Sequence, residues 1–261
     1  MPRTQRPSPI HIWHGRSPAE LDPADLTVLD DDELRRVHGR HAPARSSYAH
    51  PHAALRRVLA AFHLGGRPQD IRFGRHPCAG CGDRTHGRPR VVAPATGLEF
   101  SLTCTGPHWA VAITAGEVVG LDMEAGRSLD VPTLSALILS ERERALMASA
   151  TTAMDGRQLL LRAWTRKEAV LEAVGLGIAE DIRMVETEPA TPSPVHVAHA
   201  GSTRLTAQRH VPGPECWPRR RSRGVRGQAV WRGWPLSRSS SFAQHMMGMP
   251  RALRARRASR T

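Results

Sequence analysis

The chain is poor in cysteine, lysine and long apolar runs, and each shortage narrows what the protein can be. It has four cysteines, and its N-terminus, MPRTQRPSPIHIWHG, lacks the apolar core of a secretory signal. We therefore expect reduced thiols in a cytoplasmic protein rather than a disulfide framework. No stretch approaches the roughly eighteen consecutive apolar residues of a membrane-spanning helix, so we predict no membrane span. Hydrophobic residues still form 40% of the 261 residues, enough for a globular core.

The excess of basic charge is confined to the C-terminal segment. The formal net charge is +13, yet residues 201–261 alone hold 14 arginines and one acid, Glu215. Residues 1–200 are thus neutral overall, which argues against nucleic-acid binding by the whole protein. Residues 216–261 show no hydrophobic periodicity and are rich in arginine. Three interpretations of this tail stay open: an aberrant, frameshifted end, a disordered basic arm that binds nucleic acid or an acidic surface, or an ordered extension.

Lysine is almost absent, because Lys167 is the one lysine among the 37 basic residues. Arginine is a planar fork of donors, whereas lysine is a compact, titratable point charge. A chain that avoids lysine elsewhere makes Lys167 a candidate for chemistry, although compositional bias alone could also leave a single lysine.

Hydrophobic periodicity predicts helices mixed with short, hairpin-linked strands. We expect helices over residues 22–37, 51–64, 131–148 and 156–174, and strands over 10–13, 71–73, 98–103, 109–114, 117–123, 182–185 and 195–197. This order favours an α+β fold over alternating β-α-β units. A rough repeat of the pattern divides it into two halves, residues 1–115 and 116–215, followed by the basic tail.

Two acids stand at alternate positions in Gly120-Leu121-Asp122-Met123-Glu124. Because residues i and i+2 of a strand share a face, Asp122 and Glu124 would point the same way. Such a pair suits Mg²⁺, which takes one or two protein carboxylates and fills its octahedron with water and phosphate. Exposed acids at the end of a strand are the alternative interpretation.

A further acid, Glu168, follows Lys167 in the helix expected over residues 156–174. A helix surface laced with salt bridges would also contain such a pair. Together with the two acids of the strand, however, Glu168 makes three carboxylates near one lysine. That set suits phosphoryl-type chemistry, in which positioning and charge neutralisation dominate.

Taken in order, GLDMEAGR, LSERE and WTRKEAVLEAVGLGI resemble the signatures of the 4′-phosphopantetheinyl transferases, in particular the larger, surfactin-synthase-activating type. Upstream, FSLTCTG and HGRP resemble two further elements of that family. The resemblance covers about residues 10–215. It implies two pseudo-symmetric α+β halves with the site between them, the nucleotide side in residues 1–115 and the catalytic motifs in 116–215.

The resemblance implies a Mg²⁺-dependent holo-[acyl-carrier-protein] synthase. Such an enzyme moves the phosphopantetheine arm of coenzyme A to a serine of an apo acyl- or peptidyl-carrier protein and releases adenosine 3′,5′-bisphosphate. It would serve fatty acid, polyketide or nonribosomal peptide synthesis as a cytoplasmic monomer with no membrane partner. A catalytically impaired relative, or a nucleic-acid-binding protein that uses the basic tail, is the alternative.

The resemblance also implies roles for individual residues. The expected metal ligands are Asp122, Glu124 and Glu168. The expected catalytic residues are Lys167 at the α-phosphate, Glu143 as a base toward the carrier serine with Glu141 as an alternative, and Glu168. The expected contacts of coenzyme A are Arg56, Arg88, Pro89, Thr103, Cys104, Lys167 and Gly175.

Two positions depart from the family pattern, since Glu172 and Cys104 stand where the family usually has lysine and histidine. An acid repels phosphate, and a thiol is a poor donor, so we expect weaker binding of coenzyme A.

Cys78 and Cys81 form a single pair of closely spaced cysteines, whereas a zinc ribbon needs two such pairs. We interpret them as a reduced pair in a loop. His86 and Cys104 could complete a zinc site, which is the alternative.

Overall fold

The computed structural model describes residues 9–124, 129–150, 152–176, 181–191, 195–198 and 204–207. In the N-terminal half the helices are α1 (Pro23–Leu26), α2 (Asp31–His38) and α3 (Ala44–Leu59), and α3 runs on into a π-helical turn, η1 (Ala60–Leu64). A 3-10 turn, η2 (Pro68–Asp70), follows. The strands of this half are β1 (His11–Arg16), β2 (Arg72–Arg75), β3 (Pro89–Ala93), β4 (Leu98–Thr105) and β5 (His108–Ala115). The expected α+β fold is confirmed.

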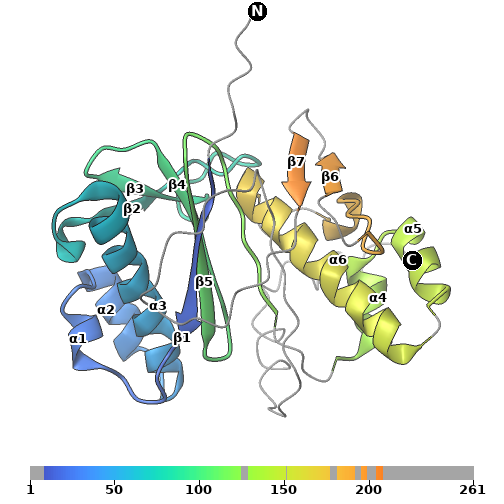
Figure 1. Cartoon of the computed structure of the whole chain (residues 1–261), viewed down its shortest axis with the longest axis horizontal. Helices are drawn as coiled ribbons and strands as arrows, with labels where there is room; N and C mark the ends of the chain where they lie inside the picture. Colours follow the sequence, from blue (N-terminus) through green and yellow to red (C-terminus); the bar gives the residue numbers. More distant parts are fainter. Residues whose placement is uncertain are drawn as a thin grey trace, which may run out of the picture.

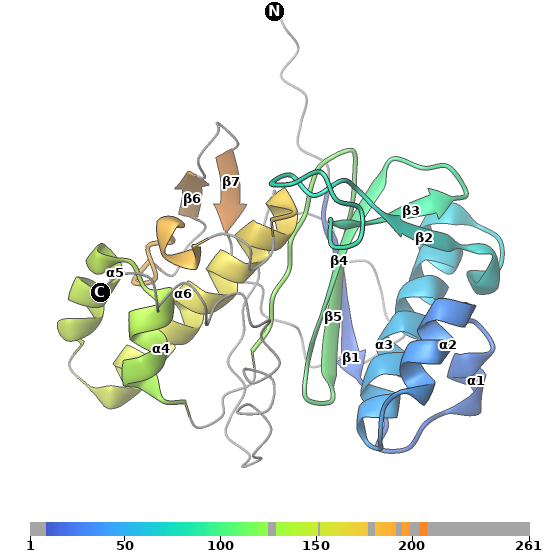
Figure 2. The ribbon, with the colours of Figure 1, turned by 180° about the vertical axis from the view of Figure 1, so that it is seen from behind.

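A three-stranded antiparallel sheet in the order β1-β5-β4 forms the centre of the molecule, and β2 and β3 form a separate antiparallel pair. The sheet stands between α3 on one side and the long helix α6 (Ala153–Val174) on the other (Figures 1 and 2). Successive residues of β5 pack on opposite faces of this sheet. Trp109, Val111 and Ile113 join the core under α3, whereas Ala110 and Ala112 join a cluster on the opposite face.

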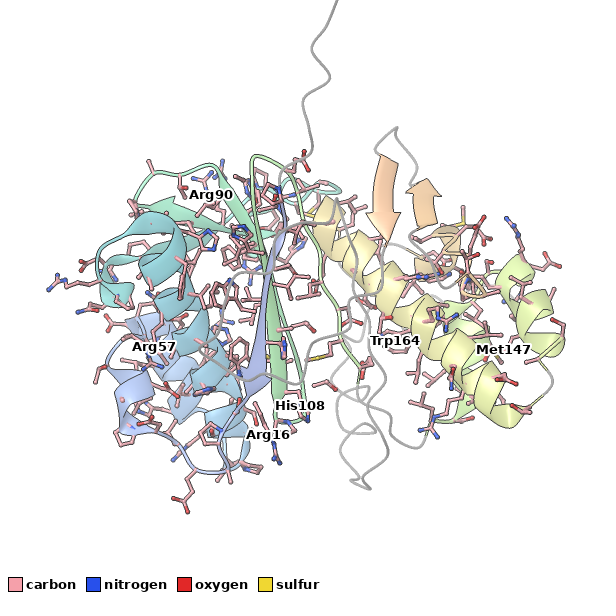
Figure 3. All side chains as sticks on the ribbon, viewed as in Figure 1. Arg16, Arg57, Arg90, His108, Met147 and Trp164 are labelled. Atoms are coloured by element: carbon pink, nitrogen blue, oxygen red, sulfur yellow. The ribbon has the colours of Figure 1, made fainter. Side chains whose placement is uncertain are left out.

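The open end of the β1–β5 pair carries basic side chains. Arg16 and His108 are register partners there and lie together at the foot of the sheet (Figure 3). Burial, and to a lesser degree the Arg16 charge, lower the pKa of His108.

The C-terminal half is built around α6. It contains α4 (Val131–Ile138), α5 (Glu141–Ala148), a 3-10 turn, η4 (Ile182–Met184), and the antiparallel pair β6 (Val195–Ala198) and β7 (Arg204–Ala207). Trp164 of α6 and Met147 of α5 pack against one cluster centred on Leu160 (Figure 3). Helix α6 ends at Gly175, whose φ of +76° is the left-handed geometry that lets the Leu176 amide bond back to Leu171.

Several predicted elements take a different form. The helices expected over 22–37 and 131–148 are each split in two, because Asp30 and Ser140 form capping boxes that start a new helix. The strand expected over 182–185 is the turn η4. The strands β3 and β7 arise in stretches where none was expected. The basic tail, residues 216–261, lies outside the described residues.

The strand expected over residues 117–123 is wrong, because this stretch is extended but joins no ladder. Its backbone is held instead by a side chain, since the Leu121 amide donates to Ser101 Oγ at 3.0 Å. The expected alternation of faces still holds. Val119 and Leu121 pack onto the sheet face that carries Ala110 and Ala112.

Gly120 faces the other way and marks the closest approach of this stretch to α6. A Cβ built at Gly120 would lie 1.8 Å from the carbonyl oxygen of Ala169 and 2.7 Å from the amide nitrogen of Ala173. Glycine is therefore required by contact between two backbones. Among the described residues, no helix is long and apolar enough to cross a membrane.

The Gly120 contact yields a stability prediction. Gly120→Ala should lower the free energy of unfolding by about 2–3 kcal/mol, because α6 must move to admit the methyl group. Urea denaturation measures the loss. Gly97→Ala is the control, since a Cβ at Gly97 meets nothing within 4 Å. Equal stability of the two variants would contradict the close approach.

Candidate functional site

The extended stretch 118–124 lies along α6 and brings acids from both into one region. Gly120 touches the α6 backbone at Ala169 and Ala173. Asp122 and Glu124 follow at alternate positions on the same side as Gly120. Glu168 and Glu172 are one turn apart on α6, on either side of Ala169 in sequence. The site is thus built from two segments whose backbones are nearly in contact.

The acids of this cluster interact electrostatically. Burial raises the pKa of Asp122 well above its usual value, and the charges of Glu172, Glu124 and Glu168 raise it further. Burial, with the Glu124 charge, raises the pKa of Glu168 to about 6. Burial also raises the pKa of Glu172 to about 7, with a smaller contribution from Glu168. The four acids are thus half-buried side chains whose charges repel one another.

A hydrogen-bond network ties this acidic cluster to the sheet. Ser101 Oγ on β4 donates to Glu172 Oε2 at 2.7 Å while accepting from the Leu121 amide. Two residues further along the same strand, Thr103 Oγ1 donates to Asp122 Oδ1 at 3.3 Å. Sequence reasoning did not assign a role to Ser101, although its i, i+2 relation to Thr103 on one strand face was a usable signal.

The cluster fits a divalent cation by the chemistry of its donors. Asp122 Oδ2 is buried and has no hydrogen-bond partner among the described residues, which is a costly state for a carboxylate. Carboxylate oxygens are the ligands that Mg²⁺ prefers, and a 2+ charge would relieve their repulsion. The oxygens of Asp122, Glu124 and Glu168 do not all lie within 4.8 Å of one another in the described structure. Binding would have to draw them closer.

Lys167 and Glu143 are not part of the acidic cluster and form a buried ion pair between α6 and α5. Lys167 Nζ is 2.6 Å from Glu143 Oε2 and donates to the carbonyls of Ile138 at 3.0 Å and Ile182 at 3.2 Å. An ammonium has three donors, so these partners use all of them. Burial lowers the pKa of Lys167, and the Glu143 carboxylate opposes that shift.

Glu143 is equally occupied and buried, with 1% of its surface exposed. It caps α5 through the Ser140 amide and accepts from the amide and hydroxyl of Thr187. In the described structure the Lys167 ammonium and the Glu143 carboxylate are thus both taken up by protein partners. Their expected roles toward a phosphate and a serine stay predictions. The alternative, Glu141, is exposed on α5.

Arg56 is enclosed in a network of protein contacts. Its side chain on α3 is fully buried, with its guanidinium bound to Asp30 Oδ2 at 2.6 Å and to Glu33 Oε2 at 2.7 Å. It also donates to the carbonyls of Pro68 and Ile71. The guanidinium ties these segments to α3, and its expected contact with coenzyme A stays a prediction.

Arg88 and Gly175 meet at the C-terminal end of α6. Arg88 Nη1 donates to the carbonyl of Ala173 at 2.9 Å, and Nη2 is 3.1 Å from Glu99 Oε2. A Cβ at Gly175 would lie 3.5 Å from the Arg88 Cβ. Arg88 Nε has no partner among the described residues. This arginine joins the two halves beside the acidic cluster.

The remaining expected contacts of coenzyme A lie on the strands of the N-terminal half. Pro89 opens β3, directly after Arg88. Thr103 is buried on β4 against Asp122, and the next residue, Cys104, has an exposed side chain.

Cys78, Cys81 and His86 converge in the loop between β2 and β3. One ligand atom of each lies within 4.8 Å of the other two, and Cys81 Sγ is 3.2 Å from His86 Nε2. Cys104 does not belong to this group. The structure thus places His86, but not Cys104, beside the cysteine pair.

Comparison with known proteins agrees with the geometry. Residues 118–218 match the profile of the 4′-phosphopantetheinyl transferase superfamily, and this range contains all four acids of the cluster. The chain is also 28% identical over 193 residues to the 4′-phosphopantetheinyl transferase HetI of Nostoc sp. strain PCC 7120, which covers 69% of this chain and 76% of that protein. Residues 118–218 therefore form a domain of the 4′-phosphopantetheinyl transferase superfamily.

Proposed function

We propose that this protein transfers the 4′-phosphopantetheine arm of coenzyme A to a serine of an apo acyl- or peptidyl-carrier protein. The observation that carries the proposal is the half-buried acidic cluster of Asp122, Glu124, Glu168 and Glu172 inside the domain that matches the superfamily. In the reaction the serine oxygen bonds to the β-phosphorus of coenzyme A. The bond to adenosine 3′,5′-bisphosphate breaks, and the serine proton is lost. Residues 1–115 would supply the nucleotide side and residues 116–215 the acids.

Asp122, Glu124 and Glu168 are the proposed ligands of Mg²⁺. The cation would neutralise the pyrophosphate and stabilise the charge that develops on the leaving group. Asp122 suits this role because its buried Oδ2 lacks a partner, and Thr103 holds its other oxygen at 3.3 Å.

Glu168 is the proposed acceptor of the serine proton. A carboxylate that binds a cation through one oxygen keeps its other oxygen free to accept a proton, so Glu168 can take both roles. Glu143, the base suggested by the sequence resemblance, is buried and fully hydrogen-bonded. We assign Glu143 and Lys167 as positioning residues that fix α5 and residues 181–191 against α6.

Arg88 is the proposed contact for the phosphates of the nucleotide. It lies at the end of α6, on the same helix as Glu168 and Glu172, and its Nε is without a partner among the described residues. Pro89, Thr103, Cys104 and Gly175 are proposed as weaker contacts. Pro89 follows Arg88 and Gly175 packs against it, whereas Thr103 donates to Asp122 and Cys104 follows it on β4.

Magnesium-dependent transfer tests the function directly. Incubation of apo carrier protein with this protein, coenzyme A and Mg²⁺ should add the mass of phosphopantetheine, and EDTA should prevent it. Asp122→Ala should lower kcat/KM at least about 100-fold, because it removes a charge-neutralising ligand worth several kcal/mol. Asp31→Ala, an exposed acid of α2, is the control. Unmodified carrier of several types, with folded protein, would contradict the proposal.

The raised pKa of Glu172 predicts how its contribution to stability depends on pH. The folded protein holds a proton on Glu172 up to about pH 7, whereas the unfolded chain releases it near pH 4.5. The folded state thus binds more protons in this window, so the glutamate destabilises it increasingly as pH rises. Relative to wild type, Glu172→Gln should gain about 2–3 kcal/mol of unfolding free energy between pH 4.5 and 7.5 in EDTA.

Comparison of the two proteins is needed because other groups titrate in the same window. His52, whose pKa burial lowers to about 4, gives the opposite slope in both proteins and cancels from the difference. Glu20→Gln, an exposed glutamate, should show no such gain. A Glu172→Gln difference that is flat with pH would contradict the raised pKa.

Glu172 also predicts the affinity for coenzyme A. Its carboxylate adds negative charge to a site that must accept phosphates, so Glu172→Lys should lower the KM for coenzyme A several-fold. Glu172→Gln should give an intermediate KM, and the KM for the carrier should change less. Circular dichroism of each variant controls for folding. An unchanged KM for coenzyme A would mean that this position lies away from the phosphates.

A further inference from the structure

The loop between β2 and β3 brings two thiols and an imidazole to one point. Cys78, Cys81 and His86 each offer a ligand atom within 4.8 Å of the others, and Cys81 Sγ is 3.2 Å from His86 Nε2. In a tetrahedral zinc site, bond lengths of about 2.0–2.3 Å place the ligand atoms about 3.5–3.8 Å apart. The observed spacing needs only small side-chain movements to reach that geometry.

A tight turn of the loop places Cys78 and Cys81 side by side. The Gly82 amide donates to the Cys78 carbonyl at 2.8 Å, and Gly82 has a φ of +77°, a left-handed geometry that favours glycine. This turn brings Cys81 back beside Cys78.

The rest of the loop delivers His86 to the two cysteines. Asp83 Oδ1 accepts from the Thr85 amide at 2.7 Å, which turns the chain between Cys81 and His86. Gly87 then passes so close to the start of the loop that a Cβ there would lie 1.8 Å from the His76 carbonyl oxygen. The His76 amide donates to the Arg88 carbonyl at 2.8 Å and closes the loop on the β2–β3 pair.

We propose that Cys78, Cys81 and His86 bind a structural Zn²⁺, with the fourth position facing solvent. Two soft thiolates and an imidazole favour zinc over the hard cation Mg²⁺. The thiolates offset the 2+ charge of the ion. Cys78 is buried, whereas Cys81 and His86 are exposed, so the ion would lie at the loop surface, where water completes the tetrahedron. This site is separate from the acidic cluster.

The zinc would fix the loop against the end of α6. Gly80 lies beside Leu176, since a Cβ at Gly80 would be 3.2 Å from Leu176 Cδ2. Two residues beyond His86, Arg88 donates to the Ala173 carbonyl. Zinc bound to Cys78, Cys81 and His86 would therefore also fix Arg88, which donates to the end of α6.

Metal content of the full chain tests the proposal without any assay of activity. Protein produced in zinc-supplemented medium, freed of affinity tags and kept reduced, should carry about one zinc per chain by mass spectrometry of the elements. Cys81→Ser and His86→Ala should each lose most of that zinc. Cys104→Ser should keep it, because Cys104 lies outside the group.

Cobalt gives a spectroscopic readout of the same site. The apo protein, titrated with Co²⁺, should show thiolate-to-cobalt charge-transfer absorption and the strong visible bands of a tetrahedral ion. Cys81→Ser should weaken cobalt binding by more than about tenfold, and Cys104→Ser should leave it unchanged. Cys81 is exposed, so this substitution is the least disruptive to folding, and melting curves check that.

Three results would overturn the proposal. The reduced wild-type protein would hold no zinc and give no cobalt spectrum, the zinc content would be the same in Cys81→Ser and His86→Ala as in wild type, or the purified protein would carry a Cys78–Cys81 disulfide in place of metal. If the wild-type protein binds zinc but shows no transferase activity, that result would contradict the proposed function and would not affect the zinc proposal.

Discussion

The contact between the backbone at Gly120 and the backbone of α6 is the constraint on which the site depends. A side chain there would meet the Ala169 carbonyl oxygen at 1.8 Å, so the two segments can approach only because residue 120 is glycine. Val119 and Leu121 hold the extended stretch on the sheet from its other side. Asp122 is thereby held beside the helix that carries Glu168 and Glu172, and Ser101 links the sheet both to Glu172 and to the Leu121 amide.

Charged side chains inside the protein are arranged in two ways, as pairs of opposite charge and as a cluster of like charges. Arg56 with its two acids and Lys167 with Glu143 are buried pairs in which every charge meets an opposite one. Such pairs leave little to gain from a ligand, and removal of one partner costs several kcal/mol. Asp122, Glu168 and Glu172 are half-buried among like charges instead, which raises their pKa values, and Asp122 Oδ2 has no hydrogen-bond partner among the described residues. A cation and a substrate could relieve that repulsion, which supports the proposal that the cluster carries the chemistry.

Sequence periodicity predicted correctly those elements that depend mainly on interactions between residues close in sequence. The hairpin of β4 and β5, the long helix α6 and the shared face of Asp122 and Glu124 all follow from periodicity of two or 3.6 residues. The partners of Lys167 and Arg56 could not be predicted, because they come from segments up to 29 residues away and depend on packing. The capping boxes at Asp30 and Ser140 were readable in sequence and would have split two helices correctly. The position of His86 beside the cysteines could not be predicted, because it depends on the loop turn at Asp83, which sequence spacing alone does not determine.

Calorimetry of Mg²⁺ binding tests most directly the claim that the half-buried acids Asp122, Glu124 and Glu168 form a cation site. The raised pKa values of Asp122, Glu168 and Glu172 mean that some of these groups hold protons near pH 6.5, and a bound cation must expel them. The account predicts that the observed binding heat at pH 6.5 changes with the ionisation enthalpy of the buffer, in the sense of proton release, and that Glu172→Gln reduces the number of protons released. Binding heats that are the same in all buffers, or that survive Asp122→Asn unchanged, would contradict it.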